Sequence, residues 1–227
     1  MIEAHDGSVR TMALRPDKRG FASGGSDKKV HFWDFEWSES ENRMTLSLMR
    51  TFEVAEDVLH VGYSPDQKII AVSLLDCTVK LFYHDTLKLF LTLFGHKLPV
   101  TCFDIASDNS MIITSSLDKS IKIWGMDFGD CRKSLSSFHH DSVTSVAFIA
   151  NTHYFMSSSR DKQIKYWDAD RFQLITTVGQ QVGSISKLAI SRFGGFMVSC
   201  GEDKTLKIWN RTEDQVRRKL NHIRVSY

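Results

Sequence analysis

The sequence predicts an all-β protein, a β-propeller of about five four-stranded blades, and two observations support this prediction. The first is an aromatic residue that recurs at spacings of 49, 42, 43 and 42 residues: Trp33, Phe82, Trp124, Trp167 and Trp209. The segment from Gly95 to Trp124 begins with Gly-His and carries the whole pattern. Repeats of about 40–45 residues that begin with Gly-His and end with an aromatic-Asp pair are typical of propeller blades.

The second observation is that other residue types recur at fixed distances before each closing aromatic residue. Six residues before it lies an aspartate: Asp27, Asp76, Asp118, Asp161 and Asp203. Ten residues before it lie Ser23, Val72, Thr114, Ser157 and Ser199. Twenty-four residues before it lie Val9, Val58, Val100, Val143 and Ile185, and twenty-eight residues before it lie His5, Val54, His96, His139 and Gln181. Five repeats in one register identify a WD-repeat β-propeller.

The composition excludes several classes of protein. The 227 residues include 42% hydrophobic and 25% charged residues, which is typical of a soluble globular protein. A formal net charge of +2 does not indicate the strong positive electrostatic field that is typical of nucleic-acid-binding proteins. No apolar run approaches the roughly 18 residues of a membrane span, and the first residues lack a signal-peptide layout. The four cysteines lack CxxC spacing, which predicts buried thiols in a reducing, cytosolic or nuclear compartment.

Taken in order, blade one is expected to use strands at 9–15, 20–24, 29–33 and 44–52. The acidic insertion 36–42 explains the long first spacing and is expected to be a surface loop. Blade two is degenerate because it has Val54, Val72 and Phe82 where His, Ser and Trp are expected, yet 69–73 and 78–82 are plain strands.

Blade three runs from His96 to Trp124, blade four from His139 to Trp167 and blade five from Gln181 to Trp209. The segment 211–227 is expected to supply the fifth outer strand, near 215–220, and a polar, basic tail. We therefore predict one WD-repeat domain over 1–227, with blades that close at about 33, 82, 124, 167 and 209. Five blades predict an incomplete or open ring, because a propeller removes its edges by closing.

A His, a hydroxyl, an Asp and a Trp recur together in three blades. The sets are His5, Ser23, Asp27 and Trp33; His96, Thr114, Asp118 and Trp124; and His139, Ser157, Asp161 and Trp167. Ser, His and Asp together suggest a nucleophile, but an active site is needed once and a structural hydrogen-bond network is needed in every blade. We expect structural networks and no catalytic, cofactor or metal site, and we expect blades two and five, which lack the His, to be held more weakly.

Two segments are more specific than the repeat: Leu74 to Cys77 (LLDC) and Trp124 to Cys131 (WGMDFGDC). With the surrounding repeats, from about Ser8 to Arg211, they resemble the WD-repeat protein 3 family, which includes the twelfth U-three protein of yeast. Members of that family are several times longer, with two propellers and a helical C-terminal domain. The resemblance implies a fragment that covers about five blades of the second propeller.

The resemblance also implies a function: a non-catalytic scaffold subunit of the small-subunit processome, which processes pre-ribosomal RNA in the nucleolus of the nucleus. The implied partners are other WD-repeat and processome proteins, and U-three small nucleolar RNA or pre-ribosomal RNA within the complex. No cofactor, small-molecule substrate or membrane is expected. Basic residues in equivalent turns are candidates for RNA contact, or simply solvated turn residues: Lys28, Lys29, Lys119, Arg160, Lys162 and Lys204.

Two rival functions use the same fold. A substrate receptor of a cullin-type ubiquitin ligase, or another protein-interaction platform, is the first. Such receptors usually carry an Arg two residues after the Asp of Trp-Asp, whereas Glu36 and Asp170 stand at that position here. A hydrolase that uses a His, Ser and Asp set is the second.

Overall fold

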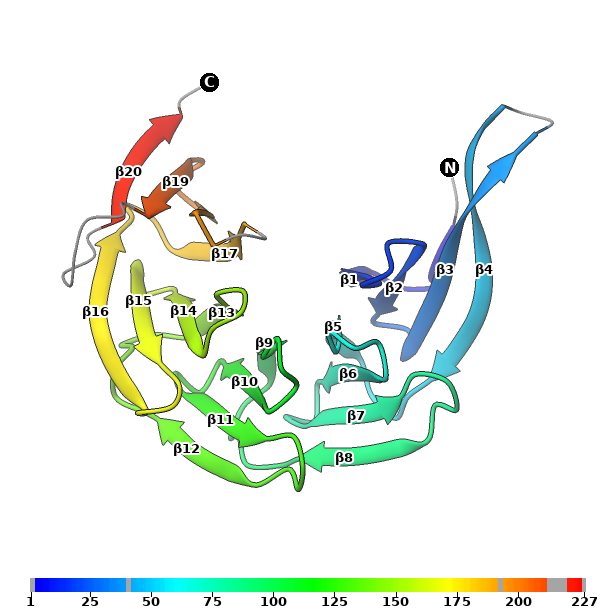
Figure 1. Cartoon of the computed structure of the whole chain (residues 1–227), viewed down its shortest axis with the longest axis horizontal. Coiled ribbons are helices and arrows are strands. Elements are labelled where there is room, and N and C mark those ends of the chain that lie inside the picture. The colour runs from blue at the N-terminus through cyan, green and yellow to red at the C-terminus, as the bar shows by residue number, and fades with distance from the viewer. Residues whose placement is uncertain (1–2, 40–41, 192–193, 212–219, 226–227) are drawn as a thin grey trace. The chain divides into compact units, whose positions relative to one another are not determined.

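A computed structural model describes residues 3–39, 42–191, 194–211 and 220–225. Within these ranges all regular elements are β-strands, β1 to β20, and they form five four-stranded antiparallel sheets (Figure 1). In each sheet the strands lie in chain order and consecutive strands pair. The prediction of an all-β WD-repeat propeller with five four-stranded blades is therefore confirmed.

The chain divides into two compact units, Met1–Val100 and Thr101–Tyr227. The single domain and the open ring stay predictions. The first unit contains blades one and two. Their strands are β1 (Val9–Leu14), β2 (Gly20–Gly25), β3 (Lys29–Ser38), β4 (Arg43–Glu53), β5 (Val58–Tyr63), β6 (Ile69–Leu74), β7 (Val79–Tyr83) and β8 (Leu89–Leu93).

The second unit contains blades three, four and five, although β9 already begins at the last residue of the first unit. The strands of blade three are β9 (Val100–Ile105), β10 (Met111–Ser116), β11 (Ile121–Gly125) and β12 (Cys131–Leu135). Those of blade four are β13 (Val143–Phe148), β14 (Tyr154–Ser159), β15 (Gln163–Asp168) and β16 (Gln173–Gln180). Those of blade five are β17 (Ile185–Ile190), β18 (Phe196–Gly201), β19 (Leu206–Arg211) and β20 (Leu220–Val225).

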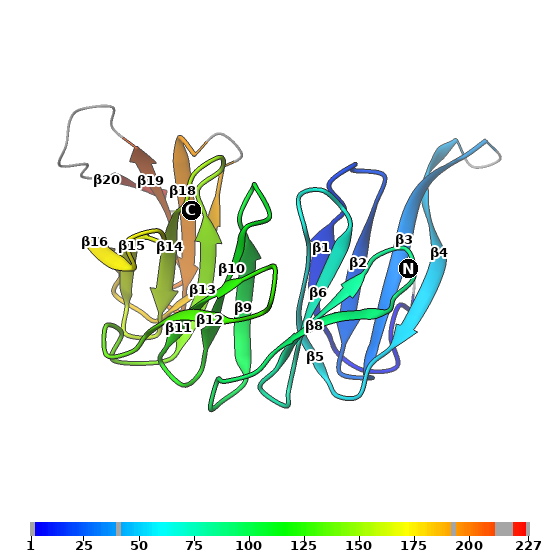
Figure 2. The ribbon, with the colours of Figure 1, turned by 60° about the horizontal axis from the view of Figure 1, so that its bottom comes forward.

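The prediction of a surface loop at 36–42 is wrong. Strand β3 continues to Ser38 and β4 starts at Arg43, so that Glu36 pairs with Thr45 and Trp37 with Met44. The insertion therefore lengthens a hairpin, as the ribbon of β3 and β4 shows (Figures 1 and 2). Phe35 and Trp37 alternate with polar residues, which is the pattern of a strand. The acidic composition of the segment had suggested a loop instead.

Two smaller expectations are also corrected. The fifth outer strand is Leu220–Val225, later than expected, and 215–219 lies outside the described residues. Only Cys102 among the four cysteines is buried, whereas Cys131 is exposed. Cys131 starts an outer strand that faces solvent, so its position in a strand does not predict burial.

Each blade presents two faces, which we name by their side chains. The tryptophan face carries the closing aromatic residue and the residue twelve positions before it, which pair across the sheet as Phe21–Trp33, Ile70–Phe82, Ile112–Trp124, Phe155–Trp167 and Met197–Trp209. The far face carries the residues one, three and eleven positions before the closing aromatic residue. Successive residues of a strand point to opposite faces, which explains why these positions separate.

Within the two units, the tryptophan face of one blade packs against the far face of the blade before it. Phe82 of blade two packs with Val30 and Phe32 of blade one. In the same way Trp167 packs with Ile121 and Ile123, and Trp209 packs with Ile164 and Tyr166. Fully burying one side chain of this size stabilises a fold by about 1.5–3 kcal/mol, so these joints hold each unit together.

Candidate functional site

The hydrogen-bond network of blade four is complete. His139 lies between β12 and β13, and Asp161 lies in the turn between β14 and β15. Both side chains are buried. The ring of His139 lies 2.8 Å from Asp161 through Nδ1 and 2.8 Å from the Ser157 hydroxyl through Nε2. The Trp167 indole N–H donates to the same hydroxyl at 2.8 Å. The Asp161 carboxylate also accepts the backbone N–H groups of His140 and Gln163, both at 3.0 Å.

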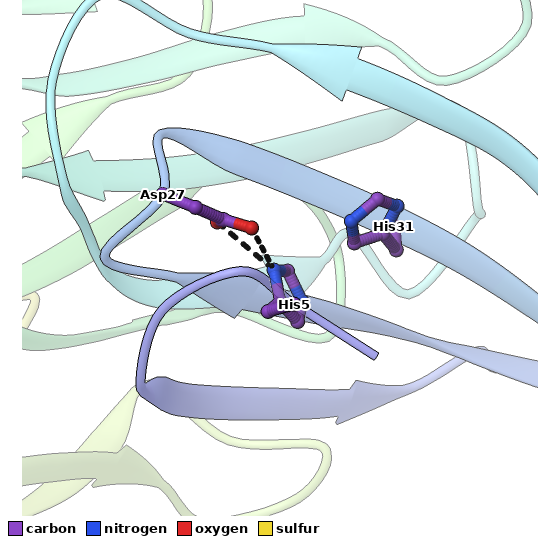
Figure 3. Close-up of side chains that lie close together, drawn as sticks. All are labelled: His5, Asp27 and His31. Carbon is purple, nitrogen blue, oxygen red and sulfur yellow. Dashed lines mark hydrogen bonds and ion pairs between the residues drawn. The ribbon is translucent and has the colours of Figure 1, made fainter. Parts of the chain in front are cut away.

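Blade one repeats this geometry. His5 Nδ1 lies 3.0 Å from both carboxylate oxygens of Asp27, and His5 Nε2 lies 2.8 Å from Ser23 Oγ. The Trp33 indole N–H donates to Ser23 Oγ at 2.9 Å. A second histidine, His31, packs edge-on against His5 with the ring centroids 4.3 Å apart (Figure 3).

His5, Asp27 and His31 bring their ligand atoms close enough together to suggest a metal site. The hydrogen bonds favour a structural role. Because the Trp33 N–H already donates to Ser23 Oγ, the hydroxyl proton can go to His5 Nε2, and the proton on Nδ1 then goes to Asp27. This arrangement leaves no lone pair on the His5 ring for a metal. His31 Nδ1 lies 2.8 Å from the Thr51 hydroxyl, so it too has a partner.

Blade three contributes Thr114, Asp118 and Trp124 from the second unit, while His96 belongs to the first unit and is buried. The Trp124 indole N–H donates to Thr114 Oγ1 at 2.9 Å. Asp118 accepts the backbone N–H of Ser120 at 2.9 Å, which stabilises the turn between β10 and β11.

Blade two lacks the network, and apolar residues that pack together replace its polar members. Val72 and Phe82 replace the hydroxyl and the tryptophan, and both join an apolar cluster that Val54 also contacts. Asp76 remains, and it accepts the backbone N–H of Thr78 at 3.0 Å. When both partners of a hydrogen bond are replaced by apolar groups, the effect on stability is small. The degenerate sequence of blade two therefore does not imply that this blade is less stable than the others.

Blade five is different, because Gln181 stands where the other networks have His. Gln181 is only 3% exposed, and neither its amide oxygen nor its amide nitrogen has a hydrogen-bond partner. One carboxylate oxygen of Asp203 is also unpaired. The Trp209 N–H still donates to Ser199 Oγ at 2.9 Å. Buried polar groups without partners are costly, so we expect this blade to be the weak one.

The turn after each network aspartate holds a residue with positive φ: Lys28, Cys77, Lys119, Lys162 and Lys204, at 62°, 70°, 67°, 71° and 59°. Two of these lysines make contacts that the sequence did not suggest. Lys28 Nζ donates to the carbonyl of Ala55 at 3.2 Å, and Lys119 Nζ donates to the carbonyl of His140 at 3.1 Å. Both carbonyls come directly after the His position of the next blade, so each lysine links two blades.

Of the remaining basic candidates, one has an ion-pair partner and three have exposed side chains. Lys29 forms an ion pair with Asp6, with 3.0 Å between Nζ and the carboxylate. Arg160, Lys162 and Lys204 are exposed, and their side chains form no hydrogen bond or ion pair with other described residues. These three lie in the turns between the second and third strands of blades four and five, at the same end of two adjacent sheets.

A second charged cluster joins blades three and four at the opposite ends of the strands. His153 Nδ1 lies 2.7 Å from Asp170 and Nε2 lies 3.0 Å from Asp108. Burial lowers the pKa of His153, but its hydrogen bonds to Asp170 and Asp108 outweigh this and raise it above the ordinary value. The three residues line an open depression of about 570 Å³. Both ring nitrogens of His153 are engaged, so this side chain bridges Asp108 and Asp170.

The four-stranded repeats and the networks of blades one and four define the class of this protein as a WD-repeat β-propeller. A family model described as the second β-propeller domain of WDR3 matches residues 1–216. The chain therefore belongs to the family of WDR3 second β-propeller domains. Among the described residues no helix is long and apolar enough to cross a membrane.

Curated relatives share part of the chain. Human WD repeat-containing protein 3 is 60% identical over 103 residues, which cover 44% of this chain and 11% of that protein. The Dictyostelium discoideum homologue of that protein is 55% identical over 106 residues, 44% of this chain and 11% of the relative. U3 small nucleolar RNA-associated protein 12 of Saccharomyces cerevisiae is 44% identical over 111 residues, 45% of this chain and 12% of the relative. The matched regions span only a small part of the length of these relatives.

We expect Ser157→Ala to lower the free energy of unfolding by about 1–3 kcal/mol, because it leaves the Trp167 N–H and the His139 ring without their shared partner. Urea unfolding of both proteins measures this. Ser199→Ala in blade five, where only the Trp209 N–H is lost, is the matched variant and should cost less. Equal losses would contradict the view that the His adds to the network.

Gln181→His should stabilise the chain by about 1–3 kcal/mol, since a His ring can bridge Ser199 and Asp203 as His139 bridges Ser157 and Asp161. Urea or thermal unfolding gives the value. The gain should vanish when Asp203→Asn is added, because the carboxylate is the partner of the new ring. A variant no more stable than the parent would show that the backbone of blade five cannot accommodate the network.

Burial raises the pKa of Asp161, but the hydrogen bond and charge of His139 outweigh it, and the pKa falls to about 2. A carboxylate with a lowered pKa stabilises the fold above its unfolded pKa and loses this contribution as the pH falls. We expect about 2 kcal/mol to be lost between about pH 4 and pH 2. Urea unfolding across this range should show a shallower decline for Asp161→Asn. The same slope in both proteins would contradict the prediction.

Proposed function

We propose that this chain is a non-catalytic WD-repeat scaffold of ribosome biogenesis, a part of the small-subunit processome that acts in the nucleolus. The observation that carries the proposal is the family of WDR3 second β-propeller domains, to which the chain belongs. The printed name of the yeast relative, a protein associated with U3 small nucleolar RNA, supports the same setting. The partners proposed are other WD-repeat and processome proteins.

The geometry of the networks supports a scaffold over an enzyme. In blade four, Ser157 Oγ contacts the His139 ring and the Trp167 N–H, and the residue is fully buried. A nucleophile has to reach a substrate, and this hydroxyl is both covered and engaged. The same arrangement in blade one makes a structural role the better proposal for both sets.

Contact with RNA is proposed for Arg160, Lys162 and Lys204. These side chains are exposed and have no partner among the described residues, whereas Lys28 and Lys119 already link blades. A row of cations at one end of two adjacent sheets can bind phosphates without reading sequence.

A substrate receptor of a cullin-type ubiquitin ligase remains the alternative platform. At the position where such receptors carry an arginine, this chain has Glu36 and Asp170. Asp170 is engaged with His153, and Glu36 lies within the long β3–β4 hairpin. Neither site offers the expected cation, so the scaffold of ribosome biogenesis is the preferred proposal.

The proposal predicts that the tagged 227-residue chain recovers processome proteins and U3 small nucleolar RNA from a nucleolar extract. Protein partners that persist after ribonuclease treatment would indicate contacts made by the blades. Recovery of neither RNA nor processome proteins by the folded chain would contradict the proposal, and recovery of a cullin ligase in their place would favour the alternative.

The RNA contact is tested with U3 small nucleolar RNA transcribed in vitro. Replacing Arg160, Lys162 and Lys204 by Ala should weaken binding and make the slope of log K against log salt shallower by about 2, since each phosphate contact on a single strand contributes about 0.7. The control replaces exposed lysines in turns of the first unit: Lys18, Lys68 and Lys88. Equal effects of the two triple variants would contradict a specific role of the first set.

A further inference from the structure

The side chain of His153 connects blades three and four within the second unit. Its Nδ1 atom lies 2.7 Å from Asp170, which belongs to the turn between β15 and β16. Its Nε2 atom lies 3.0 Å from Asp108, which belongs to the turn between β9 and β10. Because His153 itself lies in the turn between β13 and β14, the contact with Asp170 stays within blade four. The contact with Asp108 joins blade four to blade three.

The two carboxylates determine which form of the ring fits this position. An ionised carboxylate only accepts hydrogen bonds, whereas a neutral imidazole has a single N–H. A neutral ring can therefore donate to one of the two carboxylates and turns a lone pair toward the other. The imidazolium has an N–H on each nitrogen and can donate to both. The geometry around His153 thus favours the protonated ring.

The histidine of the blade-four network is in a different situation. The ring of His139 lies 2.8 Å from the carboxylate of Asp161 and 2.8 Å from the hydroxyl of Ser157. A hydroxyl can donate as well as accept, so a neutral ring satisfies both of these partners. His153 differs because both of its partners are carboxylates. The argument from hydrogen-bond chemistry therefore separates the two histidines of the same blade.

The charges that face the ring of His153 act in the same direction. They are the carboxylates of Asp108 and Asp170, whereas Arg171 lies 3.9 Å from Asp168. Burial lowers the pKa of His153, but the hydrogen bonds and charges of the two carboxylates outweigh this, and the pKa is raised. A raised pKa means that the stabilising contribution is complete below the ordinary histidine range. It is lost as the pH rises through the raised value.

The carboxylate of Asp108 is fixed in the position from which it meets the ring. Its Oδ1 atom accepts the Ser110 backbone N–H at 3.1 Å and the Ser110 hydroxyl at 2.8 Å, which leaves Oδ2 for His153. Burial raises the pKa of Asp108, but these hydrogen bonds outweigh it and lower the pKa. Asp108 is therefore ionised over the range in which a histidine titrates. Tyr154 is a further titratable side chain that lines the same depression.

We infer that His153 is a pH-sensitive link between blades three and four. At low pH the imidazolium donates to both carboxylates and ties the two blades together. When the ring loses one proton, the remaining N–H stays with Asp170, which is the nearer partner, and the contact with Asp108 is lost. The depression that these turns line then holds two carboxylates without a shared cation. This inference does not depend on the function proposed above.

The exposure of the three side chains limits the size of the effect. His153, Asp108 and Asp170 have side chains that are 29%, 48% and 61% exposed, so water screens their charges. Ion pairs in such positions change the equilibrium constant of unfolding by about two- to five-fold. The link therefore adjusts the joint between two blades and does not decide whether the chain folds. Variants of these residues should fold.

Double-mutant cycles on the full 227-residue chain test the inference, with urea unfolding at about pH 5.5 and about pH 9. The variants are His153→Gln, Asp108→Asn and Asp170→Asn, alone and in pairs. The coupling of His153 to Asp108 should be about two- to five-fold in the unfolding constant at the lower pH and absent at the higher pH. The coupling to Asp170 should persist at both. His140→Gln and Asp127→Asn, both at exposed residues, are the control pair and should show no coupling.

A histidine titration by NMR gives an independent readout. The ring of His153 should titrate above the ordinary histidine range in the wild type and lower in Asp108→Asn. The amide signal of Ser110, whose N–H donates to Asp108, should shift with the same midpoint as the ring. The amide oxygen of Asn can still accept from Ser110, so this variant keeps the turn, and circular dichroism checks the fold.

Three results would overturn the inference. The first is a coupling between His153 and Asp108 that is equal at the two pH values. The second is a coupling to Asp108 that persists at high pH while the coupling to Asp170 disappears. The third is a His153 ring that titrates identically in the wild type and in Asp108→Asn.

Discussion

A buried indole N–H requires an acceptor, and much of each blade follows from this requirement. Trp33, Trp124, Trp167 and Trp209 all donate to a hydroxyl ten residues earlier, at 2.8–2.9 Å. In blades one and four the hydroxyl in turn contacts a His ring, and the Asp that meets the ring also holds the turn before the third strand. One polar contact on the tryptophan face thus connects the second and third strands of the blade, the turn between them and the segment before the first strand.

Blades two and five show two ways of departing from this arrangement. Blade two replaces the His, the hydroxyl and the Trp together by Val54, Val72 and Phe82, so that an apolar cluster takes the place of their polar contacts, while Asp76 still accepts a backbone N–H in the turn. Blade five keeps the Trp and the hydroxyl but has Gln181, whose amide is buried and unpaired. A partly satisfied network is less favourable than either complete alternative, because the dry interior penalises each missing bond.

The histidine networks lie inside the blades, whereas several basic side chains are exposed. The polar sets that suggest chemistry are covered and fully engaged in blades one and four. The basic side chains in equivalent turns of blades four and five are of another kind, because they are exposed and have no partner among the described residues. Exposed cations on the blades fit the scaffold role that we propose on the basis of the family.

The sequence alone determined the fold class and the number of blades, because residue types at fixed offsets report which side chains share a face and a turn. In blades one and four the residues at these offsets are the ones that meet in the network. Other features depended on tertiary structure. The links from Lys28 to Ala55 and from Lys119 to His140 join separate blades, and so does the bridge through His153. No spacing within one repeat can predict a contact between two repeats. The unpaired amide of Gln181 was likewise decided by what surrounds it, because burial is a property of the packed blades and not of a single segment.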